Sequence, residues 1–342
     1  MDAMTLVGPT EFSHQRRTRP EPGEGEVLIA ISQVGICGSD LHWYKHGQMG
    51  DRVVDDPLVL GHESAGRIEA IGSGVSDFTT GDRVTIEPGI PCGTCQACRS
   101  GKYNLCLDVE FMSTPGTDGA LVEYVVWPAE FVHPLPSDVT MTEGALCEPL
   151  SVGLFAIRRG GVSVGDTVLI TGAGPIGRAA MECAQVAGAT EIVVVDIVDK
   201  KLKKATDRGA DIAINSRTQD VIETLTSHIP DGVNVAVEAT GVPAAIQTLP
   251  ELVCHGGTIV LIGLASEGAV PLDTYRLVRN QIDIRGSYRF ANTYSTVIEL
   301  LANNEVDVES MVDFHKPLAK VPEAFERATE PEVIKGVIDI IK

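Results

Sequence analysis

Hydrophobic residues follow two different patterns along the chain. Between Glu26 and Trp127, short β-rich segments are separated by glycine and proline turns; examples are EVLIAISQVG, SAGRIEAIG, DRVTI and LVEYVVW. Short runs bounded by turn residues are typical of strands in β-rich domains. This part of the chain is therefore expected to form a domain made mainly of β-strands.

From Gly165 onward the apolar runs become continuous, as in TVLIT, EIVVV, VNVAVEA, GTIVLIG and QIDIRG. Helix-length amphipathic segments separate them, a pattern typical of a parallel sheet with crossover helices. The sequence therefore predicts an α/β fold whose second part is a doubly wound sheet. After Tyr288, the segment TYSTVIELLANN predicts a helix.

The length of the chain fits this two-part pattern. It has 342 residues, and a domain typically takes roughly 150. We expect residues 1–150 to form the first domain, residues 151–287 to form the doubly wound domain, and residues 288–342 to return to the first domain.

Composition and charge exclude several classes of protein. Hydrophobic residues make up 44% and charged residues 22% of the chain, which is ordinary for a globular protein. The net charge is -20, from 47 acidic and 27 basic residues, so a polyanion would be repelled and nucleic acid is not an expected partner.

The sequence contains no targeting or membrane signal. It lacks an apolar run of the roughly 18 residues that span a bilayer and a signal peptide at its start, so we expect a cytoplasmic protein without a membrane partner. The acidic, lysine-poor composition fits a halophilic protein in a salty cytoplasm, or an ordinary acidic mesophile.

A glycine motif follows the predicted strand TVLIT. The next residues, GAGPIG, place Gly172, Gly174 and Gly177 in the spacing G-x-G-x-x-G, with Pro175 and Ile176 between them. Such glycines allow a tight turn and close approach of the backbone to a pyrophosphate at the start of a helix. These five residues are expected to bind a dinucleotide.

An acidic residue ends the next predicted strand, EIVVV. Asp196 lies nineteen residues beyond Gly177, where a carboxylate can accept hydrogen bonds from the ribose hydroxyls of the adenosine. Because the same carboxylate would repel a 2′-phosphate, the sequence predicts NAD rather than NADP. Lys201 is close enough in sequence to take part in cofactor binding and to complicate this preference.

Four of the eight cysteines lie within fifteen residues, in CGTCQACRSGKYNLC. Cys92, Cys95, Cys98 and Cys106 bring four thiolates together, which favours a cation, and four sulfurs suit a closed structural zinc site. An iron–sulfur cluster also uses four cysteines, but no redox partner is evident. A structural zinc is therefore predicted.

A second set of metal ligands lies upstream. VGICGSDLHWY supplies Cys37, Ser39 and His42, and VLGHESAG supplies His62 and Glu63. One thiolate, one imidazole and nearby carboxylates can bind zinc and leave a position open, as a catalytic site requires.

These motifs, in the order ICGSD, GHESAG, four-cysteine lobe and GAGPIG, give the chain a resemblance to the medium-chain zinc alcohol dehydrogenases along nearly its whole length. Within that family it most resembles the sorbitol (polyol) dehydrogenases, through CEPLSVG, EATG and RGSYRFANTY. The resemblance implies a GroES-like catalytic domain beside the Rossmann domain, a catalytic and a structural zinc, and a homo-oligomer, either a dimer or a tetramer.

The resemblance also implies roles for single residues. Cys37 and His62 would be zinc ligands, Glu63 a direct or close ligand, and Glu148 the remaining acid at the metal, acting directly or through water. Ser39 and His42 match groups that pass the alcohol proton outward. Residues matching the substrate pocket are Trp43, Phe111, Glu148, Arg289 and Phe290.

Two of these positions depart from the sorbitol dehydrogenase pattern. Trp43 and Phe290 stand where tyrosines are usual, so two hydroxyls are missing from the expected pocket. Tyr44 could replace one of them. These departures favour shorter or less hydroxylated substrates than sorbitol.

Together these features predict an NAD-dependent zinc oxidoreductase that takes a hydride from a secondary alcohol, such as sorbitol or xylitol, to give a ketone. The nearest alternative is another medium-chain branch that uses threonine, butanediol or a sugar phosphate. A zinc-free NADPH quinone reductase lacks the cysteine and histidine sets found here. A non-enzymatic zinc- and nucleotide-binding protein is the third alternative.

Overall fold

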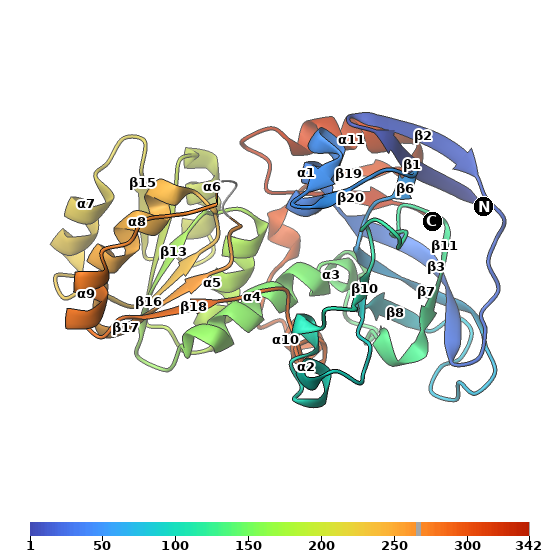
Figure 1. The fold of residues 1–342 in the computed structure, drawn as a ribbon, viewed down its shortest axis with the longest axis horizontal. Helices are drawn as coiled ribbons and strands as arrows, with labels where there is room; N and C mark the ends of the chain where they lie inside the picture. The colour runs from blue at the N-terminus through green and yellow to red at the C-terminus, as the bar shows by residue number, and fades with distance from the viewer. Residues whose placement is uncertain (265–267, 342) are drawn as a thin grey trace. The chain divides into compact units, whose positions relative to one another are not determined.

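Strand β3 (Glu26–Gly35) is the central strand of the largest sheet. The computed structural model describes residues 1–264 and 268–341. β3 pairs with β7 along most of its length, with β11 through its first half and with β20 through its last three residues. Figure 1 shows β3, β7 and β8 as neighbours in this sheet.

This seven-stranded sheet has the order β12-β8-β7-β3-β20-β19, with β11 on β3. Its remaining strands are β7 (Glu63–Ile71), β8 (Arg83–Ile86), β11 (Tyr124–Pro128), β12 (Val132–Pro134), β19 (Val312–Pro317) and β20 (Lys335–Asp339). The pairs are antiparallel except β19 with β20.

Smaller elements surround the sheet. The shorter strands of this part of the chain are β1 (Asp2–Gly8), β2 (Glu11–Arg16), β4 (Gln48–Met49), β5 (Arg52–Val53), β6 (Leu58–Val59), β9 (Gly89–Ile90) and β10 (Glu110–Phe111). Its helices are α1 (Gly38–His46), α2 (Gln96–Arg99), α3 (Met141–Ala145), α10 (Tyr294–Ala302) and α11 (Val321–Ala328).

Burial of the apolar side chains of β3 explains its central place. Val27, Leu28, Ile29 and Ile31 are at most 2% exposed, and burial of each such side chain contributes about 1.5 to 3 kcal/mol. Most of them belong to a single core that also contains residues from β1, β7, β8 and α11.

The second sheet is parallel throughout and has the order β15-β14-β13-β16-β17-β18. Its strands are β13 (Thr167–Thr171), β14 (Glu191–Asp196), β15 (Ile212–Asn215), β16 (Val233–Glu238), β17 (Val253–Leu261) and β18 (Asp283–Gly286). The order reverses direction between β13 and β16, which is the arrangement of a doubly wound Rossmann sheet.

Helices connect these strands: α5 (Pro175–Val186), α6 (Asp199–Thr206), α7 (Val221–His228), α8 (Pro243–Leu252) and α9 (Thr274–Arg279). Figure 1 shows α5, α7 and α8 around the sheet. A separate apolar core lies here, built from residues of β13 to β17 and of helices α7 and α8.

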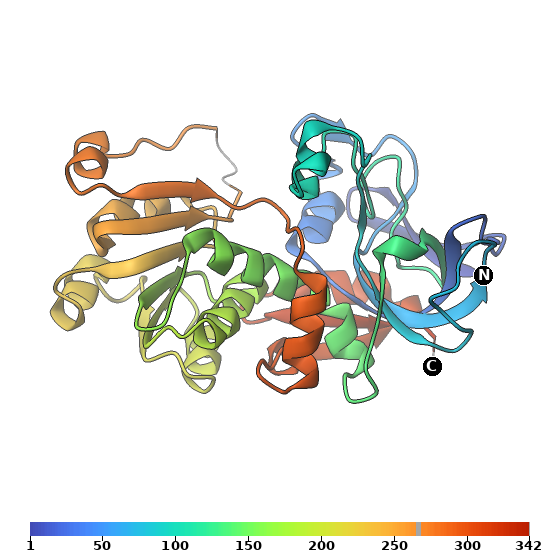
Figure 2. The same ribbon diagram turned by 90° about the horizontal axis from the view of Figure 1, so that it is seen from below.

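The chain divides into two compact units, residues 1–148 with 294–342 and residues 149–293. The first boundary lies after Glu148, inside helix α4 (Cys147–Gly160), and Glu148 therefore belongs to the first unit. Figure 2 marks both chain ends on the first unit. The expected divisions, after residues 150 and 287, lie two and six residues from these boundaries.

The predicted parallel strands are all present, and TVLIT and EVLIAISQVG match β13 and β3 in full. Sequence periodicity did not predict α1, which holds three of the expected site residues. No helix in the described ranges is long and apolar enough to cross a membrane.

Gly66 in β7 lies against β3. A Cβ atom there would be 2.2 Å from the carbonyl oxygen of Ala30. We predict that Gly66→Ala lowers the free energy of unfolding by about 2 kcal/mol or more, because backbone atoms of the central strand must move. Urea denaturation measures this.

Gly8→Ala is the matched control, since the nearest atom to a Cβ at Gly8 is a flexible carboxylate oxygen of Glu11 at 3.9 Å. Equal denaturation midpoints for both variants would contradict the close approach of β7 to β3.

Candidate active site and metal centres

The four cysteines of the lobe meet at one point. Their sulfur atoms all lie within 4.8 Å of one another. The Sγ–Sγ distance is 3.4 Å between Cys95 and Cys98 and 4.0 Å between Cys92 and Cys98. Four sulfurs at about 2.3 Å from a zinc ion would be about 3.8 Å apart, so the residues fit this metal.

Backbone amides donate to these sulfurs, as expected for thiolates. The N–H groups of Cys92, Cys95 and Cys98 lie 3.3 to 3.5 Å from the Sγ atoms of Cys106, Cys92 and Cys95. Hydrogen bonds led by the Thr94 hydroxyl lower the pKa of Cys92 to about 6, whereas burial and the neighbouring thiols raise that of Cys98 to about 12. A bound cation would favour the ionised form of all four sulfurs.

The lobe is closed at its base by a short strand pair. Gly89 and Ile90 of β9 pair with Phe111 and Glu110 of β10. The ring centroid of Phe111 lies 5.6 Å from that of His62. Phe111, expected in the substrate pocket, therefore lies beside one of the expected ligands of the catalytic metal.

The second metal group is formed by Cys37, His62 and Glu63, whose ligand atoms lie within 4.8 Å of one another. Cys37 is the N-cap of α1, and Glu63 is the first residue of β7, directly after His62. His62 and Glu63 are at most 5% exposed. A thiolate, an imidazole and a carboxylate are a donor set that zinc accepts in catalytic sites.

Asp40, which the sequence analysis did not single out, positions the imidazole. Its Oδ1 lies 3.3 Å from Nδ1 of His62 and accepts a 2.5 Å hydrogen bond from the hydroxyl of Ser113. A carboxylate at Nδ1 leaves Nε2 as the ligand atom and makes it more basic. Burial lowers the pKa of His62, but Asp40 and Cys37 outweigh burial and raise it.

Asp40 also connects the two ligand-bearing segments. Its Oδ2 accepts from the backbone N–H of Cys37 at 3.3 Å, and its Oδ1 accepts from that of Gly61 at 3.3 Å. The place of Asp40 three residues after the N-cap is the available sequence signal, since an acidic N3 residue completes a capping box.

Glu148 lies close enough to this group to sense its charges. It is 5% exposed. Burial raises its pKa to about 7; His62 and Lys335 oppose this shift, and Glu63 adds to it. Glu148 is not among the three residues whose ligand atoms converge, and its role at the metal, direct or through water, stays a prediction.

Lys335 is a second residue that sequence reasoning missed. It is 1% exposed, and its Nζ donates to the Oε1 of Glu63 at 2.6 Å and to the carbonyl of Ile36 at 2.9 Å. The two ion-pair partners are 272 residues apart in the chain, and no motif surrounds the lysine.

Helix α1 carries the remaining first-unit candidates. Ser39 is half-buried and His42 is exposed, and residues three apart lie on the same helix face. Trp43 is 3% exposed and belongs to the apolar core. The ring of Tyr44 stacks on Phe12 at 5.4 Å, so this side chain is also committed to packing.

The glycine motif forms the expected loop between β13 and α5. Gly172 has φ 96°, in the left-handed region that favours glycine. A Cβ on Gly177 would lie 1.8 Å from the carbonyl oxygen of Gly172. Gly174 is the N-cap of α5, and Pro175 and Ile176 are its first two residues. The N-terminus of this helix therefore follows directly on the glycine loop.

Asp196 ends β14 beside this loop. Its Oδ2 accepts from Ala173 N–H at 2.7 Å, and its Oδ1 accepts from Ile197 and Val198 N–H at 2.7 and 2.9 Å. These bonds fix the carboxylate and leave at least one of its roughly four acceptor sites for a hydroxyl. Lys201 is half-buried on α6.

Arg289 and Phe290 belong to the second unit, whereas the metal ligands belong to the first. Arg289 has φ 50°, and its guanidinium lies 5.0 Å from the ring centroid of Tyr288. Phe290 is 4% exposed. Their contact with substrate stays a prediction.

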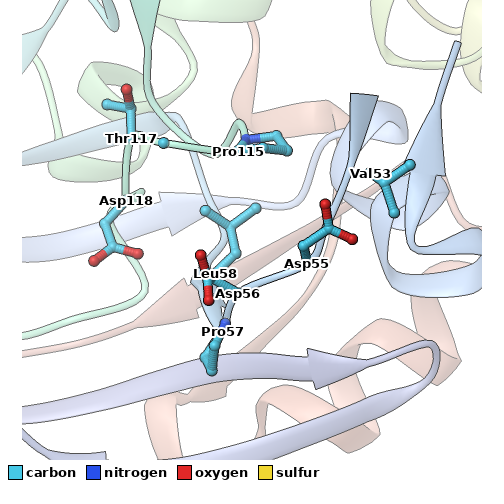
Figure 3. Close-up of a pocket in the computed structure, with 9 residues that line it drawn as sticks. Val53, Asp55, Asp56, Pro57, Leu58, Pro115, Thr117 and Asp118 are labelled. Carbon is cyan, nitrogen blue, oxygen red and sulfur yellow. The ribbon is translucent and has the colours of Figure 1, made fainter. Parts of the chain in front are cut away.

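A cavity of about 340 Å³ lies elsewhere in the first unit (Figure 3). Its lining residues are Val53, Asp55, Asp56, Pro57, Leu58, Pro115, Gly116, Thr117 and Asp118. None of the predicted site residues lines it. Asp118 is engaged by Arg17 at 2.5 Å and by Val59 N–H at 2.8 Å.

Comparisons with known proteins decide the family. The alcohol dehydrogenase GroES-like domain matches residues 23–137, and the zinc-binding dehydrogenase model matches residues 175–303. A sorbitol dehydrogenase of Bacillus subtilis is 42% identical over 331 residues, which cover 96% of this chain and 94% of that protein. The chain belongs to the zinc-binding alcohol dehydrogenase family.

Solved structures of this family agree. An Escherichia coli oxidoreductase/dehydrogenase of unknown specificity has a TM-score of 0.95 and 37% identity, covering 100% of this chain and 99% of its own. An Escherichia coli alcohol dehydrogenase complexed with NADH has a TM-score of 0.93 and 28% identity, covering 99% of each chain. The predicted GroES-like and Rossmann fold is confirmed.

The two metal groups should differ in what their loss does. We predict two zinc ions per chain. Cys95→Ser should lower the free energy of unfolding by about 2 to 4 kcal/mol, because metal bound there stabilises the lobe. Cys37→Ser should abolish activity with little change in the melting temperature. Metal analysis and calorimetry measure both.

Cys254→Ser is the control, since Cys254 is partly exposed and lies outside both groups. Zinc-free wild-type protein that stays active, or equal melting temperatures for the Cys95 and Cys37 variants, would contradict these roles.

Proposed function

We propose that this protein is an NAD-dependent zinc polyol dehydrogenase, which oxidises a secondary alcohol flanked by further hydroxyls to a ketone. The convergence of Cys37 with the buried His62 and Glu63 within 4.8 Å carries the proposal. The 42% identity to a sorbitol dehydrogenase supports the substrate class.

In this reaction the secondary carbon gives a hydride to the nicotinamide of NAD, and the alcohol oxygen gives up its proton. Zinc held by Cys37, His62 and Glu63, with Glu148 nearby, acts when bound as a Lewis acid that lowers the pKa of the alcohol. Asp40 keeps the imidazole of His62 in the tautomer that binds metal.

Helix α1 offers a way out for the proton. Ser39 is half-buried and shares a helix face with the exposed His42, whose ring centroid lies 4.7 Å from that of His46. The Ser39 hydroxyl would accept the proton of the alcohol while it donates its own proton to His42, and the imidazoles would pass that proton to solvent. This route uses side chains of one helix only.

Substrate preference follows from the polar groups assigned to the pocket. Glu148, one of these groups, would pair with a hydroxyl next to the reacting carbon, which ethanol lacks. An unpaired buried polar group costs about 1 to 3 kcal/mol. Trp43 and Phe290 lack phenol hydroxyls, which favours short polyols and vicinal diols, while Phe111 lies beside His62.

We predict that kcat/KM for xylitol, sorbitol or 2,3-butanediol exceeds that for ethanol about ten- to a hundredfold. Initial rates of NAD reduction across these alcohols and threonine measure this. The Cys37→Ser protein, purified in parallel, controls for contaminating dehydrogenases. Ethanol or threonine leading the series would eliminate the polyol assignment.

Cofactor choice should depend on Asp196. Its carboxylate is fixed beside the glycine loop by three backbone N–H groups, and it would accept from a ribose hydroxyl and repel a 2′-phosphate.

We predict that the wild-type protein has a higher kcat/KM with NAD than with NADP. Asp196→Ala should lower the ratio of these two values about tenfold or more. Asp207→Ala is the matched control, because it removes an exposed acid paired with Lys203 in the same unit. A wild-type preference for NADP would mean that Lys201 or another base determines the choice.

The acidic composition supports a halophilic protein. At a net charge of -20, like charges repel, and salt screens them. We predict that the melting temperature rises between roughly 0.1 M and 2 M potassium chloride, with an enzyme of near-neutral charge as control. An unchanged melting temperature would favour an ordinary mesophile.

Two further features support a location in the cytoplasm and a homo-oligomeric state. All eight cysteines are free, and five of them must stay reduced to bind metal, Cys37 and the four of the lobe, which fits the cytoplasm. Edge strand β18 supports a homo-oligomer: Ile284 is 37% exposed, and antiparallel pairing of two copies about Ile284 would place Asp283 opposite Arg285 of the other chain.

A further inference from the structure

Lys335 and the metal compete for the same carboxylate. The Nζ of Lys335 lies 2.6 Å from the Oε1 and 2.5 Å from the Oε2 of Glu63. The same carboxylate lies within 4.8 Å of the ligand atoms of Cys37 and His62. The ammonium group of Lys335 attracts the negative charge of the Glu63 carboxylate, so the carboxylate would donate less strongly to a metal ion.

The surroundings hold this arrangement in place. Glu63 is fully buried and pairs with Gly35 across β3 and β7. A Cβ on Gly35 would lie 2.0 Å from the Oε2 of Glu63, so this glycine gives the carboxylate its space. The Nζ of Lys335 is held on its other side by the carbonyl of Ile36, the residue before Cys37.

The charge balance gives the lysine a large effect. The buried acids around the metal position are Asp40, Glu63 and Glu148, together with the Cys37 thiolate. Lys335 is the one buried lysine of the described residues, and charges in a poorly hydrated interior are weakly screened.

We propose that Lys335 is a positioning residue that holds Glu63 partly away from the catalytic metal and so keeps the metal electrophilic and exchangeable. This inference rests on the proposed function for the identity of the metal. Without the lysine, Glu63 becomes a full ligand, which binds the metal more tightly but makes it a weaker Lewis acid.

The test is release of the catalytic zinc to a chelator. The variant Lys335→Met, prepared with zinc, should release it about tenfold more slowly than wild type. Partners of metal ligands have effects of this size, but their loss usually weakens metal binding; here the sign is opposite because the freed carboxylate becomes a full ligand. Its cobalt-substituted form should have a changed visible spectrum. Lys335→Arg, which keeps the charge, should stay close to wild type in both measurements.

The decisive comparison introduces Lys335→Met into a protein that already carries Glu63→Gln. In that protein Lys335→Met should change neither the release rate nor the cobalt spectrum, because the lysine acts through the carboxylate. Lys203→Met, which removes an exposed lysine of the second unit, is the control and should behave as wild type.

Faster or unchanged release from Lys335→Met, or an equal effect in the Glu63→Gln background, overturns the proposal. Lys335→Gln is measured alongside in case the methionine variant does not fold. Failure of both to fold with zinc present also overturns it, since the lysine would then have a structural role that metal does not replace. These measurements need no substrate, so a failed polyol assay leaves them intact.

Discussion

Negative charge that must be buried at the ends of β3 and β7 is the constraint on which the first unit depends. Asp40, Glu63 and Glu148 are each at most 5% exposed, and Cys37 adds a thiolate when it binds metal. Isolated charges in a protein interior cost several kcal/mol each unless they are paired. The fold meets this with one buried lysine, with backbone amides and, by the donor set, with a metal ion.

The two metal groups solve the same problem in different ways. In the lobe, all four donors are sulfurs from one short segment, and their own backbone amides stabilise the thiolates. At Cys37, His62 and Glu63 the donors come from α1 and β7, and they are oriented by residues that do not bind the metal. The first arrangement depends on one short segment of the chain. In the second, the ligands His62 and Glu63 are also affected by residues outside the ligand set, Asp40 and Lys335.

This difference also decides what the sequence could predict. The cysteine spacing, the glycine loop and five of the six strands of the parallel sheet are encoded by neighbouring residues, so local patterns were sufficient for them. The remaining strand, β15, has four residues and was not predicted. Ser113 bonds to Asp40, which lies 73 residues away in the chain, and Lys335 bonds to Glu63, which lies 272 residues away. A lysine that begins a short strand reads as a surface residue, and its burial follows only from the pairing of β20 with β3.

The second unit contains an instructive contrast. Glu238, at the end of β16, is fully buried, yet backbone amides satisfy it: Thr240 N–H donates at 2.8 Å, Gly241 N–H donates at 3.0 Å, and the Thr240 hydroxyl also donates. A carboxylate held by neutral donors keeps its charge in place without a cation. Glu63 is held instead by the ammonium group of Lys335, a cation with which a metal ion can compete for the carboxylate, and this is the property that a ligand of a catalytic metal needs.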